Sequence, residues 1–147
     1  LSVNIRKKPS LFFSVKQTDF KFCLDYNNSS SNILFGVDEL YLSSLPLGAA
    51  GWVGSTYNHL APLYHKITEA FENKENILAG KLQGKAMRFV ELLDHYGGYN
   101  GVAKGLMKTL GVDCGPSRFP HSSLNEQRYQ QITETLKKEG IFQYTSR

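Results

Sequence analysis

The chain has 147 residues, enough for one domain, and its hydrophobic content of 41% is typical of a globular protein. Its formal net charge is only +4, and the basic residues are spread among acidic ones. Nucleic-acid-binding proteins instead gather Lys and Arg into a stripe, often with aromatic residues between them. The composition therefore argues against a nucleic-acid partner.

The sequence also shows no signal of a membrane or secreted protein. No apolar stretch reaches the ~18 residues of a membrane-spanning helix, and the basic cluster at residues 6–8 leads into Pro9 rather than an apolar signal-peptide segment. The two cysteines, Cys23 and Cys114, are too few for a disulfide framework and have no metal-ligand spacing. We therefore expect a cytoplasmic protein with reduced thiols, no metal and no membrane partner.

Short apolar runs alternate with longer helical patterns in the first part of the chain. The runs lie at Leu11–Val15, Ile33–Phe35 and Gly48–Val53, and a serine-rich connection at Asn27–Asn32 precedes the second run. Short, continuously apolar strands are typical of a parallel sheet buried on both faces, and alternation with helices is typical of βαβ units. The sequence therefore predicts an α/β fold with three parallel strands.

The rest of the chain predicts four helices, in which apolar residues recur at helical spacing. Gly97 and Gly98 are expected to end the second of these helices, and Gly111 the third. Ser123 and Glu126 have the spacing of a capping box and are expected to begin the last helix. The four apolar sets are Leu60, Leu63, Ile67, Ala70 and Phe71; Leu82, Ala86, Phe89, Val90 and Leu93; Val102, Ala103, Leu106, Met107 and Leu110; and Tyr129, Ile132 and Leu136.

Lys16 ends the first apolar run, where parallel-strand proteins commonly place catalytic groups. Apolar surroundings at such a position would favour a neutral amine, which can attack a carbonyl to form an imine. The alternative interpretation is an ordinary exposed lysine at a strand end.

Polar residues also follow the other two runs. Gly54 would let the backbone approach an anion, while Ser55 and Thr56 could donate hydrogen bonds to a carboxylate; the alternative is an N-capped helix after a tight turn. The adjacent acids Asp38 and Glu39 could accept hydrogen bonds from a polyol, or they could simply favour the dipole of a first helical turn. Because the three strand ends would face one mouth, their convergence favours a functional site.

These segments resemble the N-acetylneuraminate lyase branch of the pyruvate-dependent class I aldolases, which includes dihydrodipicolinate synthase. Val15–Thr18 resembles the family's Schiff-base lysine segment, Gly36–Glu39 its sialic-acid-contacting turn, and Gly54–Asn58 the run after the last barrel strand. Gly115–Pro120 is similar to the proline-containing connection before the final helix.

The resemblance implies the C-terminal half of a (β/α)8 TIM barrel within one domain, residues 1–147. Its last three strand–helix units would lie at about residues 11–72, and a C-terminal helical region at about residues 73–147. It also implies a homotetrameric enzyme that cleaves N-acetylneuraminate, a sialic acid, to N-acetylmannosamine and pyruvate without a dissociable cofactor. Lys16 would form the imine, and the substrate's polar groups would contact Thr18, Gly36, Asp38, Glu39, Gly54 and Ser55.

The chain departs from the family pattern in one respect that bears on activity. By this resemblance it starts just before the sixth barrel strand, so the segment with the proton-relaying tyrosine has no counterpart; Tyr26, Tyr41, Tyr57 and Tyr64 lie in no such motif. Three hypotheses follow. The chain is part of a working lyase completed by a second chain, an inactive fragment that binds a full-length homologue, or an unrelated small α/β binding domain.

Overall fold

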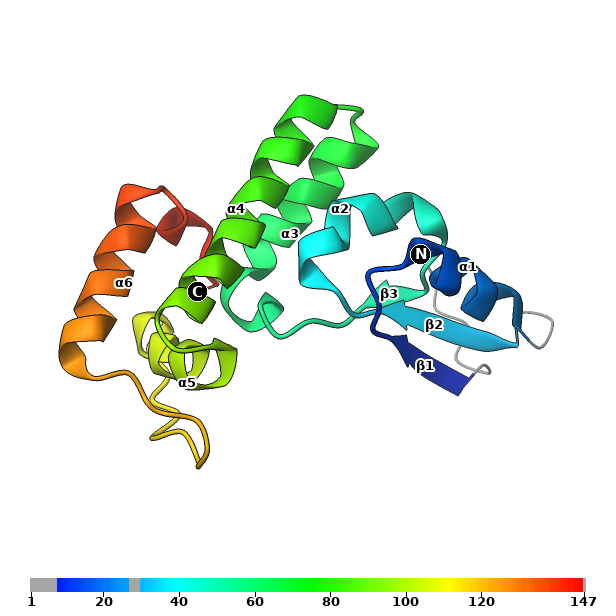
Figure 1. Cartoon of the computed structure of the whole chain (residues 1–147). Helices are drawn as coiled ribbons and strands as arrows, with labels where there is room; N and C mark the ends of the chain where they lie inside the picture. Colours follow the sequence, from blue (N-terminus) through cyan, green and yellow to red (C-terminus); the bar gives the residue numbers. More distant parts are fainter. Residues whose placement is uncertain (1–7, 27–29, 147) are drawn as a thin grey trace.

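A computed structural model describes residues 8–26 and 30–146, which form a small parallel sheet followed by a helical region (Figure 1). The strands are β1 at Lys8–Phe12, β2 at Ser31–Phe35 and β3 at Gly51–Trp52, in the spatial order β1-β2-β3. Both strand pairs are parallel. The α/β class and the three parallel strands expected from the sequence are therefore confirmed.

The strand register brings the carboxyl ends together. Phe12 pairs with Phe35, and Phe35 pairs with Trp52, so these three residues lie at one level across the sheet. The segments that follow them, which carry most of the predicted site residues, consequently leave the sheet at the same edge.

Two predicted strand boundaries are wrong. The first strand ends at Phe12, and the apolar run continues into the connection, where the side chains of Phe13 and Val15 are 68% and 71% exposed. The third strand is only two residues long, because the segment before it contains a 3-10 turn at Leu45–Leu47 and then Gly48 in the left-handed conformation, with φ of 84°. Apolar character alone did not distinguish a strand from its approach.

Short helical pieces connect the strands, and longer helices follow the last one. Helix α3, at Tyr57–Glu72, is kinked at Leu60, which has φ of −123° and lies two residues before Pro62. Because proline lacks an N–H and fits best in a first helical turn, the regular part of α3 effectively restarts at Pro62. The elements are α1 Gln17–Asp25, η2 Asp38–Leu40, α2 Tyr41–Ser44, η3 Leu45–Leu47, α3 Tyr57–Glu72, α4 Asn76–His95, α5 Tyr99–Leu106, η4 Met107–Leu110, α6 Glu126–Lys138 and η5 Phe142–Tyr144.

The four predicted helices are all present, as α3, α4, α5 continued by η4, and α6. The predicted glycine ends are also observed. Gly97, Gly98 and Gly111 have φ of 129°, 90° and 81°, values that a residue with a side chain rarely adopts.

The predicted capping box at the start of α6 is wrong. The N-cap is Asn125, whose Oδ1 accepts a hydrogen bond from Arg128 N at 2.9 Å. Ser123 has another role, because its Oγ accepts a hydrogen bond from Ser117 N at 2.8 Å within the preceding loop. That loop bond leaves the capping position to the asparagine two residues further on.

The apolar core has two parts. Around the sheet, Phe20 of α1 packs edge-on against Phe12 and Phe35, with ring centroids 5.0 and 5.2 Å apart. The larger part lies among the helices and includes fully buried residues such as Leu63 of α3. Trp52 contacts both parts, so the end of β3 links the sheet to the helical region.

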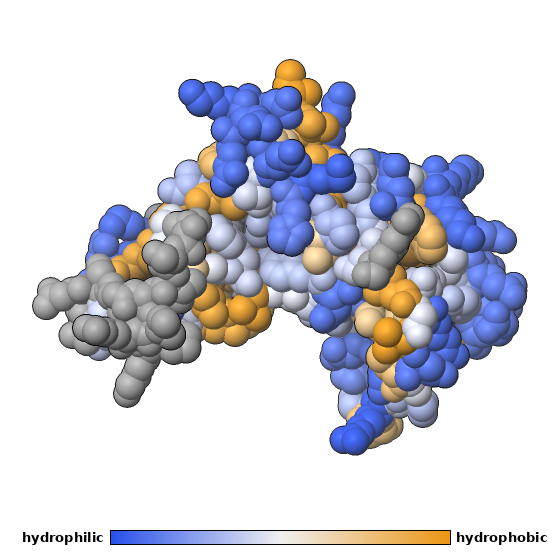
Figure 2. All heavy atoms as spheres, turned by 180° about the vertical axis from the view of Figure 1, so that it is seen from behind, coloured by the Kyte–Doolittle hydropathy of each residue, from blue (hydrophilic) through white to orange (hydrophobic). Residues whose placement is uncertain are grey.

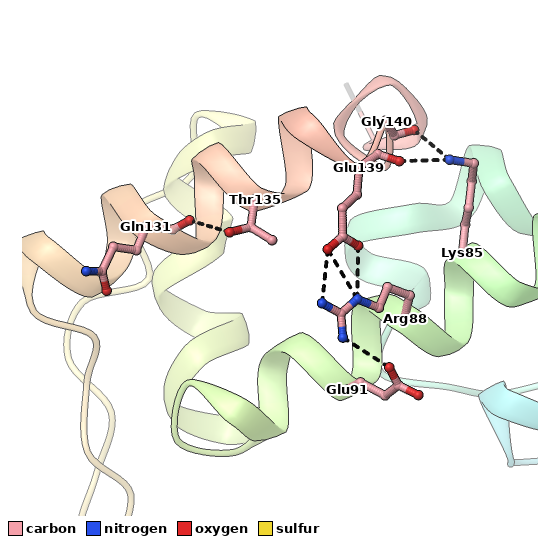
Figure 3. Close-up of polar contacts among 7 residues, drawn as sticks. All are labelled: Lys85, Arg88, Glu91, Gln131, Thr135, Glu139 and Gly140. Atoms are coloured by element: carbon pink, nitrogen blue, oxygen red, sulfur yellow. Dashed lines mark hydrogen bonds and ion pairs between the residues drawn. The ribbon is translucent and has the colours of Figure 1, made fainter.

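Polar contacts join α4 to the end of α6. Arg88 on α4 forms a two-pronged ion pair with Glu139, just beyond α6, and also contacts Glu91 (Figure 3). Lys85 donates a hydrogen bond to the Glu139 carbonyl at 2.9 Å. These groups lie at the surface, so they contribute orientation more than stability.

The surface carries dispersed apolar patches. On the face seen in Figure 2, orange regions are separated by hydrophilic surface and occur toward both the sheet end and the helical end. Ile77, near the tip of the α3–α4 hairpin, is 78% exposed. Among residues 8–26 and 30–146, no helix is both long and apolar enough to cross a membrane.

Candidate active site

A cleft of about 560 Å³ opens at the carboxyl edge of the sheet. Five of the seven residues predicted for the site line it: Gly36, Asp38, Glu39, Gly54 and Ser55. They come from the segments that follow β2 and β3, whose ends lie side by side in the register. The predicted convergence of these two strand ends is therefore observed.

Asp38 is the most firmly held of these residues. Its side chain is buried, and its Oδ2 accepts two hydrogen bonds from Thr56, one from the backbone N at 3.1 Å and one from Oγ1 at 2.6 Å. Thr56 is the N-cap of α3, so the positive end of that helix lies at the carboxylate. This contact ties the turn after β2 to the helix after β3.

A tyrosine extends the contact into the core. Thr56 Oγ1 lies 2.7 Å from Tyr64 Oη, and all three members of the Asp38–Thr56–Tyr64 chain are buried. Because Thr56 Oγ1 donates to Asp38, the Tyr64 hydroxyl must be the donor to Thr56. Burial raises the pKa of Tyr64 above its ordinary value, so the phenol stays protonated and able to donate.

Thr56 therefore does not serve the predicted role of a donor to a ligand carboxylate. The carboxylate that it binds is the protein's own Asp38. The cleft is lined by Asp38, Glu39 and Asp94, and neither Lys nor Arg is among its lining residues. Acceptors without a balancing cation suit a neutral ligand with several hydroxyl groups better than an anion.

The two acids of the turn face different surroundings. Asp38 Oδ1 is buried and makes no direct hydrogen bond among the described residues. The buried Tyr57 hydroxyl interacts with the same carboxylate, and burial together with this carboxylate raises the pKa of Tyr57. Glu39 is half-buried and also lines the cleft. Of the two acids, Glu39 is therefore the more accessible to a ligand hydroxyl.

The two glycines make room for this arrangement. A Cβ on Gly54 would overlap the Asp38 carboxylate, and a Cβ on Gly36 would lie 3.0 Å from both the Phe12 carbonyl oxygen and the Phe13 ring. The sequence pattern suggested that Gly54 admits a ligand anion. The structure shows that its missing side chain admits a carboxylate of the protein instead.

Lys16 and Thr18, the other two predicted residues, do not line this cleft. Lys16 lies four residues beyond β1, as the N-cap of α1, and its backbone N donates to Ser14 Oγ at 3.1 Å. Both side chains are exposed, so the apolar surroundings expected for Lys16 are absent. In this structure Lys16 lies on the connection between β1 and α1, beyond the end of the strand. Its chemical role stays a prediction.

Sequence reasoning missed several residues of the cleft. Val90 and Asp94 of α4 and Tyr99 at the start of α5 belong to the helical region, far along the chain from the strand ends. Tyr99 Oη donates to the Ser55 carbonyl at 2.5 Å, which fixes the loop between β3 and α3. Gly97 and Gly98, which directly precede Tyr99, predicted the end of α4, but nothing in the sequence predicted the contact between Tyr99 and Ser55.

Among the described residues, no three His, Cys, Asp or Glu side chains lie close enough together to hold a metal ion. The two cysteines are likewise free thiols, with Cys23 half-buried and Cys114 exposed.

The sequence was compared with known protein families. Residues 14–139 match the model of the dihydrodipicolinate synthetase family. N-acetylneuraminate lyases from Pongo abelii and Homo sapiens are each 35% identical to this chain over 129 residues. That alignment covers 86% of this chain but only 40% of each relative. The chain thus spans about two fifths of the length of these relatives.

Solved structures give the same result. The N-acetylneuraminate lyase of Proteus mirabilis superimposes with a TM-score of 0.81 at 31% identity, over 88% of this chain and 44% of that one. The lyase of Aliivibrio salmonicida superimposes with a TM-score of 0.83 at 25% identity, over 92% and 45% of the two chains.

Proposed function

The chain belongs to the dihydrodipicolinate synthetase family, as its motifs predicted, and from this premise we propose that it is the C-terminal half of an N-acetylneuraminate lyase barrel. The observation that carries the proposal is the cleft in which Gly36, Asp38, Glu39, Gly54 and Ser55 come together. The cleft has carboxylate acceptors and neither Lys nor Arg among its lining residues, which suits the hydroxylated part of a sialic acid. The relatives described above are named N-acetylneuraminate lyases.

In the proposed reaction, the neutral amine of Lys16 adds to the C2 carbonyl of the open-chain sugar acid and water leaves, which gives an imine. The protonated imine draws the electron pair of the C3–C4 bond as that bond breaks, while a base takes the proton of the C4 hydroxyl, which becomes the aldehyde of N-acetylmannosamine. By the family resemblance this base is the proton-relaying tyrosine, which the other part of the barrel would supply. Protonation of the resulting enamine at C3 and hydrolysis then release pyruvate and restore Lys16. No dissociable cofactor takes part in these steps.

We assign the sugar-binding part of this work to the cleft. Glu39 would accept hydrogen bonds from hydroxyl groups of the substrate, and Gly36, Asp38, Gly54 and Ser55 would line the cleft beside it. Thr18 would contact the substrate near Lys16. The pyruvate end would lie toward Lys16, which is exposed and outside the cleft in this structure.

A second candidate function is favoured by that exposure. Within the described residues β1 pairs only with β2, so its other edge is open, and Val15 beyond the end of the strand is 71% exposed. An open edge with apolar neighbours is a surface that further strands would cover. On this alternative the chain binds the remaining barrel strands, from a full-length homologue or a second chain, and has no turnover by itself.

A homotetramer is the family arrangement that we propose for the complete cytoplasmic enzyme.

The test of the lyase proposal is trapping of the imine. The chain is incubated with pyruvate and borohydride, and the modified lysine is located by mass spectrometry. We expect the reduced adduct on Lys16, its loss in Lys16→Ala, and an unchanged yield in Lys66→Ala, which alters an exposed lysine of α3. Lyase activity that survives Lys16→Ala would reject the mechanism.

The binding alternative has its own measurement. Sedimentation and dye binding report whether the chain associates and whether it exposes apolar surface. A compact monomer that binds no dye would contradict the half-barrel picture.

A further inference from the structure

Gln83 lies on the buried face of α4 and is only 7% exposed. Its side-chain amide makes three hydrogen bonds to the turn that carries the two acids. Oε1 accepts from Leu42 N at 2.9 Å, and Nε2 donates to the carbonyls of Asp38 and Glu39 at 3.2 and 3.1 Å. Because the backbone N–H can only donate and the carbonyls can only accept, these partners fix the orientation of the amide.

The hydrogen bonds from Gln83 satisfy backbone groups of the turn that have no α-helical partner within the turn. In a continuous α-helix, Leu42 N would donate to the Asp38 carbonyl four residues earlier. Here Asp38–Leu40 form a 3-10 turn whose Asp38 carbonyl accepts instead from Tyr41 N, and Gln83 takes both Leu42 N and the second position on that carbonyl. The shape of the turn is therefore held from α4, 41 to 45 residues further along the chain.

We propose that Gln83 is a positioning residue for the sugar-binding cleft. It is not among the cleft's lining residues, and it would act by holding the backbone of Asp38 and Glu39 so that one carboxylate reaches Thr56 and the other stays at the cleft. The inference rests on the proposed function only in naming a sugar as the ligand. It makes the α4 helix part of the site's framework.

A near-isosteric substitution tests this role. In Gln83→Glu, the ionised carboxylate can still accept from Leu42 N but faces the carbonyls of Asp38 and Glu39 without a donor. When that carboxyl is protonated it again offers one donor and one acceptor. Gln127→Glu makes the same change of charge at an exposed position of α6 and is the matched control.

The first experiment measures binding of N-acetylmannosamine by NMR titration and, separately, trapping of pyruvate on Lys16 with borohydride. We expect Gln83→Glu to weaken sugar binding about ten-fold at pH 7, an effect of the size expected for buried polar groups that lose their partners. Pyruvate trapping should stay at the wild-type yield. As the pH falls, the ratio of variant to wild-type affinity should return toward one. Gln127→Glu should match wild type throughout.

An unchanged sugar affinity in Gln83→Glu would overturn the proposal, as would equal losses of sugar binding and pyruvate trapping or a ratio that does not recover at low pH. Each of those results would mean that Gln83 contributes only to the packing of the core and does not position the cleft.

A second measurement does not depend on the ligand. If the wild-type chain binds neither sugar nor pyruvate, the proposed function fails, and the positioning role is then decided by the Thr56 amide. That amide donates to Asp38, so its resonance should shift and its hydrogen exchange should accelerate in Gln83→Glu but not in Gln127→Glu. A Thr56 amide indifferent to Gln83→Glu would refute the positioning role.

Discussion

The Cα of Gly54 lies so close to Asp38 that a Cβ there would overlap Asp38 Oδ1. The carboxylate cannot simply move away, because Oδ2 is held by the backbone N and the hydroxyl of Thr56. Gly54 therefore lets the segment after β3 close on the turn after β2, and the cleft depends on this approach.

Gly54→Ala should therefore destabilise the fold by about 1–3 kcal/mol, the usual effect of inserting atoms into a packed site. It should also weaken sugar binding, since Asp38 must shift. The free energy of unfolding is measured by urea denaturation. The control is Gly80→Ala, at an exposed position in the second turn of α4, where no atom lies within 4 Å of the new Cβ. That change should be neutral or stabilise the chain by up to about 1 kcal/mol, because alanine is the better helix former. A Gly54→Ala chain as stable as the Gly80→Ala chain would refute the close contact.

The sequence predicted those features of the site that depend on strand order and turn chemistry. Gly36, Asp38 and Gly54 could be assigned to one edge because parallel strands deliver their following loops to the same side of a sheet. The helices after β3 were likewise predictable, since their apolar spacing and glycine ends are local properties of the sequence. The relatives then agreed with the motifs.

Contacts between distant segments could not be predicted in this way. Nothing local indicates that Thr56 binds Asp38 rather than a ligand, or that Gln83 on α4 reaches back to the same turn. The end of β1 was missed for a related reason. An apolar run gives the existence of a strand, but its end is decided by pairing with a neighbour, and β1 stops at Phe12 opposite Phe35.

The start of α6 provides a test of the corrected cap. Asn125→Ala removes the acceptor for Arg128 N and should lower stability by about 1 kcal/mol, with faster hydrogen exchange of the Arg128 amide. Ser123→Ala removes only the loop contact to Ser117 N, so exchange at Arg128 should not change. Faster Arg128 exchange in Ser123→Ala, with none in Asn125→Ala, would restore the capping box that the sequence suggested.

The ion pair between α4 and the end of α6 should be visible in the titration of one carboxyl group. The Arg88 guanidinium, through its hydrogen bonds, lowers the pKa of Glu139 below its ordinary value (Figure 3). Carboxyl NMR should show that Arg88→Gln raises the pKa of Glu139 toward that value, with little change in stability because the pair is exposed. Arg118→Gln, in the exposed loop before α6, is the control and should leave the Glu139 titration unchanged.

His59 should make stability depend on pH. The residue is 4% exposed, its ring lies against Phe89, and Nε2 is 2.8 Å from the Ala103 carbonyl. Since a carbonyl only accepts, Nε2 carries the proton, and Nδ1, which has no partner among the described residues, is the site that acid would protonate. Burial lowers the pKa of His59 below 6.5, and the hydrogen bond to Ala103 opposes that shift only in part.

The sign of the pH effect follows from the lowered pKa. Below pH 6.5 the unfolded chain binds a proton at His59, whereas the folded chain does not until the pH reaches the lower folded-state value. The stabilisation is therefore complete above pH 6.5 and is lost as the pH falls, by up to about 1.4 kcal/mol per pH unit. The free energy of unfolding is measured by urea denaturation from about pH 7.5 to about pH 5, at steps of about half a unit. In His59→Gln it should fall less steeply with decreasing pH than in wild type, because the glutamine amide can still donate to Ala103 but cannot take up a proton. His65→Gln alters an exposed histidine of the same helix and should retain the wild-type slope; if it flattens the profile as much as His59→Gln does, the buried ring is not the group responsible.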